Sequence, residues 1–265
     1  MSPAKQDTAP TRLPLSVVII AKNEAERIEE CLASITWADE IVVVDSGSTD
    51  ATCDIARRYT DRVHFIPWQG FGPQKQATVD LASHEWILNV DCDERVTLEL
   101  AAEIRQILSL PPPQGAYSIP RRTFLGRKEI KQCGWYPDRT IRLFDRTKSR
   151  YSDSLVHERV ITDGAIGACS EHLLHYSFTG LSQLLAKLNN YSDLSARQMF
   201  DQGRRCSLFD LTVRPLFAFF KTYLLKTGIF DGVEGLVISV TTAMLTFAKY
   251  TKLRELNNQD SDNQP

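Results

Sequence analysis

The sequence lacks the cysteine patterns that mark disulfide frameworks and zinc sites. Its six cysteines are scattered, with no Cys-x-x-Cys pair and no histidine at zinc-finger spacing. This distribution is typical of reduced, mostly buried thiols in a cytosolic protein. We therefore expect free cysteines.

An excess of charge of one sign is also missing. The chain has 31 basic and 33 acidic side chains, which gives a net charge of -2 with neutral histidine. Such a balance produces no general positive field, so we expect no nucleic-acid partner. Any other anionic ligand must meet a local basic patch.

Long apolar runs are absent as well. Residues 1–14 are polar and lack the apolar stretch of a signal peptide. The apolar stretch at 236–248 is interrupted by serine and threonine, and it is shorter than the roughly 20 residues that span a bilayer. We expect neither export nor a transmembrane helix.

Apolar residues nevertheless make up 43% of the 265 positions, enough for one sizeable core and an appended subdomain. Runs typical of strands occur at 15–20, 41–44, 63–66 and 86–90. Helical patterns follow them at 24–35, 49–59, 74–81 and 98–108. This alternation predicts an α/β fold with a mainly parallel sheet covered on both faces.

The pattern changes after a proline-rich break at 111–115. Short extended segments, separated by aromatic and charged loops, are predicted at 116–120, 140–144 and 159–161. From residue 181 onward helical patterns replace them.

Three carboxylates, Asp91, Asp93 and Glu94, follow the apolar strand at 86–90. Ligands of open α/β sheets sit beyond the carboxyl ends of the strands. Divalent cations that bridge phosphates take one or two carboxylates and complete their shell with phosphate oxygens. Asp91-x-Asp93 therefore predicts a Mg²⁺ or Mn²⁺ diphosphate site, and the alternative is a solvated acidic turn.

Other polar residues are expected at the same edge of the sheet. Asp45 ends the second strand, where it could accept from a uracil imide or a ribose hydroxyl, or cap a helix that begins near Thr49. Ala21, Asn23 and Glu24 close the first strand. Lys75 follows two glycines at a predicted helix start, where backbone N–H groups favour anions.

These segments carry a resemblance to a known family. SVVIIAKNE, EIVVVDSGSTD, GFGPQKQ and WILNVDCDE closely resemble the nucleotide-binding half of family 2 glycosyltransferases with the GT-A fold. GWYPDRTIRLFDR and LVHERV resemble bacterial lipopolysaccharide-core β-1,4-glucosyltransferases, which extend the inner-core heptose. The similarity spans about residues 15–255. Many family members have two adjacent acids after the second strand, whereas here Asp45 is followed by Ser46.

The resemblance implies a Rossmann-like GT-A sheet with a C-terminal α-helical extension. We expect a nucleotide-sugar half at 15–110, an acceptor half at 111–180 and a helical, membrane-associating region at 181–255. Residues 1–14 and 256–265 are expected to be disordered tails.

The resemblance also assigns roles to residues. Asp93 and Asp91 would hold the metal ion, and the nucleotide-sugar would contact Ala21, Asn23, Glu24, Asp45, Lys75 and Asp91. Inverting transfer needs a base that activates the acceptor hydroxyl. The matching position is Glu158, and His157 competes because its ordinary pKa of about 6.5 suits proton transfer. Asp153 and Asp138 are further candidates, and a salt bridge of Glu158 with Arg159 or Arg146 is the structural alternative.

The acceptor sugar would be met by Trp135, Tyr136, Asp138 and Arg142. Aromatic faces stack on sugar C–H groups, carboxylates accept from hydroxyls, and arginine can reach phosphate through paired donors. Each of these could equally be a core or turn residue.

An amphipathic pattern marks residues 214–226. Its apolar members, Leu216, Phe217, Phe219, Phe220, Tyr223 and Leu224, recur at helical spacing, with Arg214, Lys221 and Lys226 as cationic flanks. This pattern is typical of a helix in a membrane interface. Packing on the catalytic core or in a homo-oligomer is the alternative.

Together, these observations predict metal-dependent, inverting transfer of a hexose from a UDP-sugar, with UDP-glucose favoured. The lipid-linked acceptor would be an inner-core heptose, at the cytoplasmic face of the inner membrane. A polyprenyl phosphate acceptor and a non-catalytic sugar-nucleotide-binding scaffold are the alternatives.

Overall fold

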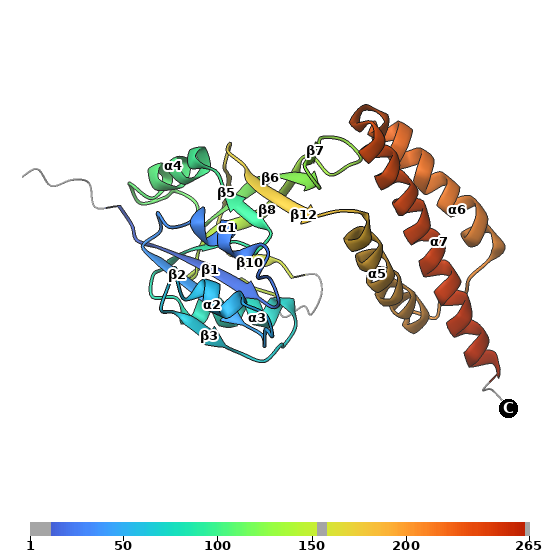
Figure 1. Cartoon of the computed structure of the whole chain (residues 1–265), viewed down its shortest axis with the longest axis horizontal. Helices are drawn as coiled ribbons and strands as arrows, with labels where there is room; N and C mark the ends of the chain where they lie inside the picture. Colours follow the sequence, from blue (N-terminus) through green and yellow to red (C-terminus); the bar gives the residue numbers. More distant parts are fainter. Residues whose placement is uncertain (1–11, 153–157, 263–265) are drawn as a thin grey trace, which may run out of the picture. The chain divides into compact units, whose positions relative to one another are not determined.

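The chain forms two compact units. The computed structural model describes residues 12–152 and 158–262 (Figure 1). The first unit is formed by the described parts of 1–121 and 138–175, and the second by those of 122–137 and 176–265.

A mixed sheet, with a parallel half and an antiparallel half, forms the centre of the first unit. Its strand order is β3-β2-β1-β4-β8-β6-β12-β5. Parallel pairing joins β1 (Leu15–Ala21), β2 (Glu40–Asp45), β3 (Val63–Phe65) and β4 (Trp86–Asn89). Antiparallel pairing adds β8 (Asp138–Asp145) to β4 and β6 (Ala116–Leu125) to β8. Next to β6 lies β12 (Leu173–Phe178), which pairs antiparallel with β5 (Glu94–Val96). The predicted α/β class is thus confirmed.

Both faces of the parallel strands are covered, because adjacent β1 residues enter different cores. Val17 packs in one cluster with residues of α1 (Ile28–Ala33) and α4 (Leu98–Ile107). Val18 packs in the other with Val79 of α3 (Phe71–Leu81). α2 (Thr52–Ala56) contributes Ile55 and Ala56 to the first cluster. The continuous β-branched runs of the sequence reflect this two-sided burial.

The first helix begins later than the sequence pattern predicts, at Ile28 instead of residue 24. The N–H groups of Glu24 and Ala25 donate to the side chains of Thr52 and Asp50, respectively. The segment before α1 is therefore fixed as a turn against the loop that follows β2.

The remaining short strands of the chain are β7 (Lys128–Ile130), β9 (Ser149–Tyr151), β10 (Val160–Thr162) and β11 (Ile166–Ala168). β9 and β10 form a separate antiparallel pair. β11 runs parallel to β6. All six cysteines are free thiols, as predicted, and four of them are buried.

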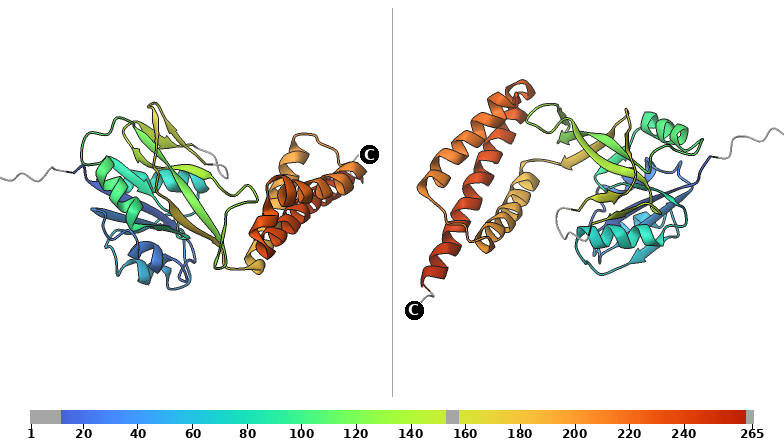
Figure 2. Two further views of the ribbon diagram at one scale, coloured as in Figure 1. Left: turned by 90° about the horizontal axis from the view of Figure 1, so that it is seen from above. Right: turned by 180° about the vertical axis from the view of Figure 1, so that it is seen from behind.

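The second unit is mainly helical. α5 (Leu181–Asp201) and α6 (Leu208–Phe220) both pack against α7 (Val233–Asp262), as Figures 1 and 2 show. A π-helical turn (Lys221–Leu225) and a 3-10 turn (Gly228–Asp231) connect α6 to α7. Among the helices of residues 12–152 and 158–262, none is long and apolar enough to cross a membrane.

The connecting turns also hold the loop that follows β7. The Asp231 carboxylate accepts from the N–H groups of Lys131 (3.2 Å) and Gln132 (2.8 Å). The N–H of Cys133 donates to the carbonyl of Lys226 at 2.9 Å. The loop and the helical turns therefore form one hydrogen-bonded piece.

The expectation of a disordered tail from residue 256 is wrong for the described part of that segment. α7 continues to Asp262. Asn257 is buried, and its side chain accepts from the N–H of Cys206 and donates to the carbonyl of Arg204. A polar sequence is thus helical here because it satisfies the backbone of the α5–α6 loop.

Candidate functional site

The carboxyl ends of β1, β2 and β4 share one edge of the sheet. Ala21 lies opposite Asp45 in the parallel register. The Asn23 side chain accepts from the N–H of Thr49, and the N–H of Asn23 donates to the hydroxyl of Ser48. The loops after β1 and β2 are therefore joined, as a shared edge requires.

The carboxylate of Asp45 accepts hydrogen bonds from the turn that follows it. Its carboxylate accepts from the N–H groups of Gly47 (2.8 Å) and Ser48 (2.9 Å) and from the Ser48 hydroxyl. Burial opposes ionisation, but the hydrogen bonds from Ser48 and Gly47 hold the pKa of Asp45 below its ordinary value. Asp45 does not cap α2, because Asp50 accepts from the N–H of Thr52 instead.

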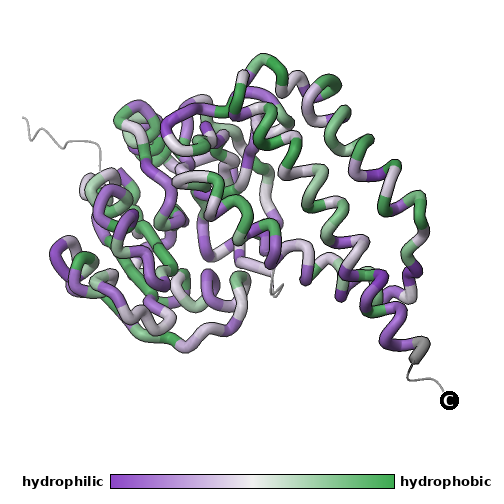
Figure 3. The backbone as a smooth tube through the Cα atoms, turned by 45° about the vertical axis from the view of Figure 1, so that its right-hand side comes forward, coloured by the Kyte–Doolittle hydropathy of each residue, from purple (hydrophilic) through white to green (hydrophobic). Residues whose placement is uncertain are grey.

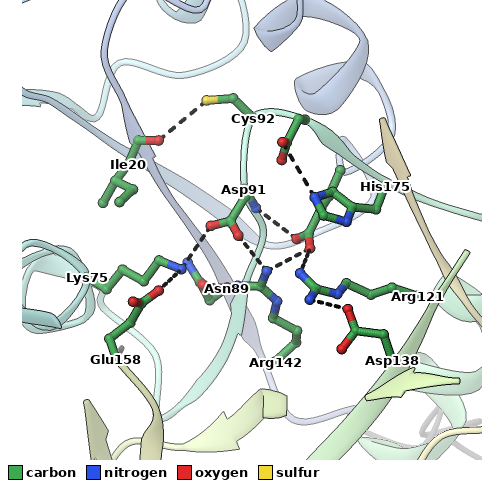
Figure 4. Close-up of polar contacts among 12 residues, drawn as sticks. Ile20, Lys75, Asn89, Asp91, Cys92, Arg121, Asp138, Arg142, Glu158 and His175 are labelled. Carbon is green, nitrogen blue, oxygen red and sulfur yellow. Dashed lines mark hydrogen bonds and ion pairs between the residues drawn. The ribbon is translucent and has the colours of Figure 1, made fainter. Parts of the chain in front are cut away.

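Lys75 is directed toward two carboxylates. It is buried on α3, and its Nζ lies 3.1 Å from an oxygen of Asp91 and 2.9 Å from Oε1 of Glu158 (Figure 4). The neighbouring Gln74 is also buried and donates to the Ser46 hydroxyl at 3.2 Å. The start of α3 is thus tied to the loop after β2, while its lysine joins the loop after β4 to Glu158, two residues before β10.

Asp91 lies between two cations. Lys75 contacts one carboxylate oxygen, and the Arg142 guanidinium donates to the other. Burial raises the pKa of Asp91, but the charges of Arg142 and Lys75 outweigh burial and hold it well below its ordinary value. Asp91 is therefore an anion in the folded chain.

Glu94 is the buried acid that contacts both Asp91 and Arg142. It is completely buried, and it accepts from the N–H of Asp91 at 3.0 Å and from Arg142 at 2.6 Å. Arg121 lies 3.3 Å from the same carboxylate. One buried acid thus fixes the backbone of the acidic loop and the arginine that faces it.

A second buried contact positions Arg142 from the other side. The Asn89 side chain accepts from Arg142 at 2.7 Å and from the Tyr151 hydroxyl at 2.9 Å. Burial is the main reason that the pKa of Tyr151 rises to about 12, so its hydroxyl keeps its proton. Arg142, expected at the acceptor, is a buried member of the polar network.

Asp93 lies beside a residue that the sequence analysis did not select. Its carboxylate is 3.5 Å from Nε2 of His175, and His175 pairs with Glu94 across β12 and β5. Among the described residues, no three His, Cys, Asp or Glu side chains gather as a metal site. The carboxylate of Asp93 nevertheless fits Mg²⁺ or Mn²⁺ where substrate phosphates complete the shell.

Glu158 lines a cavity of about 200 Å³. Its charged walls are Lys75, Asp91, Arg121, Arg142, Glu158 and Arg159. The carboxylate of Glu158 contacts Lys75, and Arg146 donates instead to the carbonyls of Val79 and Ala82. His157 and Asp153 lie outside the described residues.

The proposed acceptor residues divide between the two units. Asp138 pairs with Arg121 and so joins the network of the first unit. Trp135 and Tyr136 belong to the second unit, where the Trp135 ring lies 5.7 Å from that of Phe178 and Tyr136 is exposed.

Glu24, which follows β1 at the edge expected to bind the nucleotide-sugar, lies 3.9 Å from Arg27.

The sequence analysis missed four members of this network as site residues: Asn89, Glu94, Arg121 and His175. Asn89 and Glu94 flank the acidic motif, and a polar residue within an apolar strand is a usable signal. No local sequence signal marks Arg121 and His175, because their positions depend on how β6 and β12 join the sheet.

Comparisons with known proteins show the family of the chain. A family model described as glycosyl transferase family 2 matches residues 16–166. The chain is 34% identical over 254 residues to an uncharacterized glycosyltransferase of Rickettsia conorii, with 91% of this chain and 90% of that relative covered. It is 32% identical over 255 residues to the lipopolysaccharide core biosynthesis glycosyltransferase LpsC of Rhizobium meliloti, with 91% and 92% covered.

Solved structures with similarity to the chain include S. aureus TarS 1-349 in complex with UDP-GlcNAc. That match has 15% identity and a TM-score of 0.49, and it covers 95% of this chain and 93% of the other. Glucosyl-3-phosphoglycerate synthase from Mycobacterium tuberculosis, with Mg²⁺ and UDP, matches at 26% identity and a TM-score of 0.35, covering 43% and 44%. TM-scores below 0.5 do not establish a shared fold, so family membership rests on the sequence matches.

Proposed function

Because the chain belongs to glycosyltransferase family 2 and is an enzyme of the GT-A fold, we propose that its first unit transfers a hexose from a UDP-sugar, with glucose favoured. The observation that carries this proposal is the contact of Lys75 with both Asp91 and Glu158. It connects the acid after β4, where a donor diphosphate would lie, to a second acid that lines the same cavity.

Asp93 would hold the metal ion, and His175 lies beside it. Asp91, also expected at the metal ion, has both carboxylate oxygens paired with Lys75 and Arg142 and would face the donor sugar instead. When bound, Mg²⁺ or Mn²⁺ neutralises the charge that develops on the leaving diphosphate. Glu94 supports metal binding by the acidic loop, because its carboxylate accepts from the N–H of Asp91. Glu94 also belongs to β5 and lies opposite His175 in the pairing of β5 with β12. The acidic loop is thus preorganised before the donor binds.

Glu158 is the proposed general base. Its carboxylate would take the proton of the acceptor hydroxyl while the acceptor oxygen bonds to C1 of the sugar and the bond from C1 to the diphosphate oxygen breaks. Lys75 holds Glu158 in the cavity, since its side chain is buried and contacts Oε1. Asp91 and Glu158 therefore keep separate tasks on either side of one cation.

For the acceptor, we propose an inner-core heptose of lipopolysaccharide. The similarity to LpsC, whose name refers to lipopolysaccharide core biosynthesis, supports a saccharide acceptor of this class. In the first unit, Arg121, Asp138 and Arg159 supply donors and an acceptor for sugar hydroxyls or phosphate substituents. An assay with core heptose against polyprenyl phosphate separates the two acceptor classes.

A lipid-linked acceptor requires access to a membrane surface, and α6 supports this part of the proposal. Five apolar side chains on one face of α6 are exposed by 44 to 63%: Phe209, Val213, Leu216, Phe217 and Phe220. We call this set the apolar face of α6. Figure 3 shows the hydropathy of each residue along the backbone. Phe219 is partly buried and stacks on Tyr223 instead, at a ring distance of 5.4 Å. A face of this kind would bind the bilayer interface.

Calorimetric titration with UDP and GDP, each with and without Mn²⁺, tests the donor. We expect UDP to bind tightly only with the metal ion and GDP to bind more weakly. The matched variants are Asp93→Asn, which should lose the metal dependence, and the exposed acid Asp163→Asn, which should keep it. Absence of nucleotide binding under every condition would contradict the transferase proposal and favour a scaffold.

A further inference from the structure

Three cations surround one buried aromatic ring in the second unit. The guanidinium carbons of Arg204 and Arg214 lie 5.1 and 5.5 Å from the centre of the Tyr250 ring, and Nζ of Lys249 lies 5.2 Å from it. They come from the α5–α6 loop, α6 and α7. The packing of α6 on α7 therefore collects positive charge at one place.

The carboxylate of Asp210 faces this cluster, and it is already engaged. Asp210 lies 2.5 Å from Arg214 and 3.4 Å from Arg204, and it also accepts from the N–H and hydroxyl of Ser207. Asp210 is buried because it completes the cap of α6. It neutralises one of the three cations, so the cluster keeps a local excess of positive charge.

Lys249 shows the excess of positive charge in this cluster most directly. Within residues 12–152 and 158–262 it has no hydrogen bond or ion pair, although it is only partly exposed. Burial, together with the charges of Arg204 and Arg214, lowers the pKa of Lys249. The Tyr250 ring offers cation–π attraction but no negative charge.

The cluster borders the apolar face of α6. Arg214 lies over the ring of Phe209, with 5.9 Å between the guanidinium carbon and the ring centre, and Phe209 is 56% exposed. A bilayer presents the same sequence of environments, with acyl chains next to phosphate groups. A soluble anion would account for the charges but not for the apolar residues beside them.

We propose that Arg204, Arg214 and Lys249 form a binding site for the phosphate of an anionic phospholipid, at the edge of the apolar face of α6. This inference rests on the membrane contact in the proposed function and adds the headgroup chemistry to it. Anionic lipid attracts each basic residue near its surface strongly enough to change binding about fivefold.

The test uses the full-length protein and Lys249→Glu in sedimentation with two kinds of vesicle, phosphatidylcholine alone and phosphatidylcholine mixed with phosphatidylglycerol. Wild type should bind the mixed vesicles more tightly. Lys249→Glu changes the charge by two units and should lower binding to them about 25-fold, with binding to phosphatidylcholine unchanged. Because the new carboxylate would pair with Arg204 and Arg214, the variant should melt at or above the wild-type temperature.

Lys128→Glu is the matched control, because it makes the same charge change at an exposed residue of the second unit, on β7. Equal loss of binding by both variants, or wild-type binding that ignores phosphatidylglycerol, would overturn the site. Unchanged binding of Lys249→Glu to the mixed vesicles would do the same. Transfer to a detergent-solubilised acceptor, measured alongside, shows separately whether the catalytic proposal holds.

Discussion

The ammonium of Lys75 lies 2.9 Å from Oε1 of Glu158, and both groups are largely shielded from solvent. The same ammonium contacts Asp91. Lys75 therefore joins the two carboxylates to which we assign separate catalytic tasks, although the sequence suggested only an anion-binding role for it.

Lys75→Met should destabilise the protein and abolish transfer. It leaves Glu158 without its ion partner, whereas Asp91 keeps Arg142. Breaking such a pair costs about 3 kcal/mol at the low end of measured values. Urea denaturation and steady-state kinetics check this, with Lys75→Arg expected to recover much of the stability and Lys128→Met to change neither property.

Stability should fall in acid because of Asp91. Its folded pKa is lowered, whereas an unfolded aspartate titrates at about pH 3.9. Between the two values the unfolded chain binds more protons, so this contribution is complete above about pH 5 and is lost as the pH decreases. Urea midpoints of metal-free protein against pH should fall less steeply for Asp91→Asn. The exposed Asp54→Asn should follow wild type, and equal slopes for all three would refute the assignment.

Asp93→Ala should abolish metal-dependent turnover. Without Asp93 the proposed site keeps only His175 from the protein, which cannot hold Mg²⁺ or Mn²⁺ in place. Transfer from UDP-glucose is measured over a range of Mn²⁺ concentrations. Full activity of the variant in excess chelator would rule out the metal role, and His175→Gln should weaken metal affinity without eliminating it.

Glu158→Gln should lower kcat by about 10²-fold or more and leave donor binding intact, the usual scale for loss of a general base. Single-turnover transfer and UDP titration separate the two effects. Asp163→Asn removes an exposed acid between β10 and β11 and serves as the control. Unchanged kinetics would transfer the role to His157 or Asp153.

Leu216→Glu with Phe217→Glu should move the protein from the membrane to the soluble fraction. Both side chains are more than half exposed, so the folded chain loses little packing. Leu98→Glu, at a residue of α4 that is 86% exposed, is the matched control and should fractionate like wild type. A double variant that unfolds, or forms smaller oligomers than wild type, would favour protein contact at this face instead.

The edge of the parallel sheet could be predicted because its signals are local. β-branched runs predict the strands, and an acid directly after a buried strand predicts the site, as Asp45 and Asp91 do. The α/β class and the helical C-terminal region followed from such patterns, and the GT-A fold followed from the family resemblance. All three are confirmed.

The interior of the site could not be predicted in the same way. Arg142 reaches Asn89 and Asp91 because β8 pairs antiparallel with β4, placing Leu143 opposite Leu88. No local pattern in the sequence specifies that pairing. The contact of Lys75 with Glu158 joins residues 83 positions apart, so it too depends on the complete fold. Asn257 shows the opposite error, since a polar composition concealed a buried helical position.

The hydrogen bonds from Asp231 and Lys226 to residues 131–133 have a practical consequence for dissecting this enzyme. Truncation after β12 would remove more than the helices, because Ile130 and Cys133 would lose Ile238 as a packing partner. It would also leave the N–H groups of Lys131, Gln132 and Cys133 without their acceptors. If a shortened protein binds UDP but fails to use acceptors, the result would therefore indicate that the loop after β7, which carries Trp135, has collapsed. It would not indicate a catalytic role for the helices.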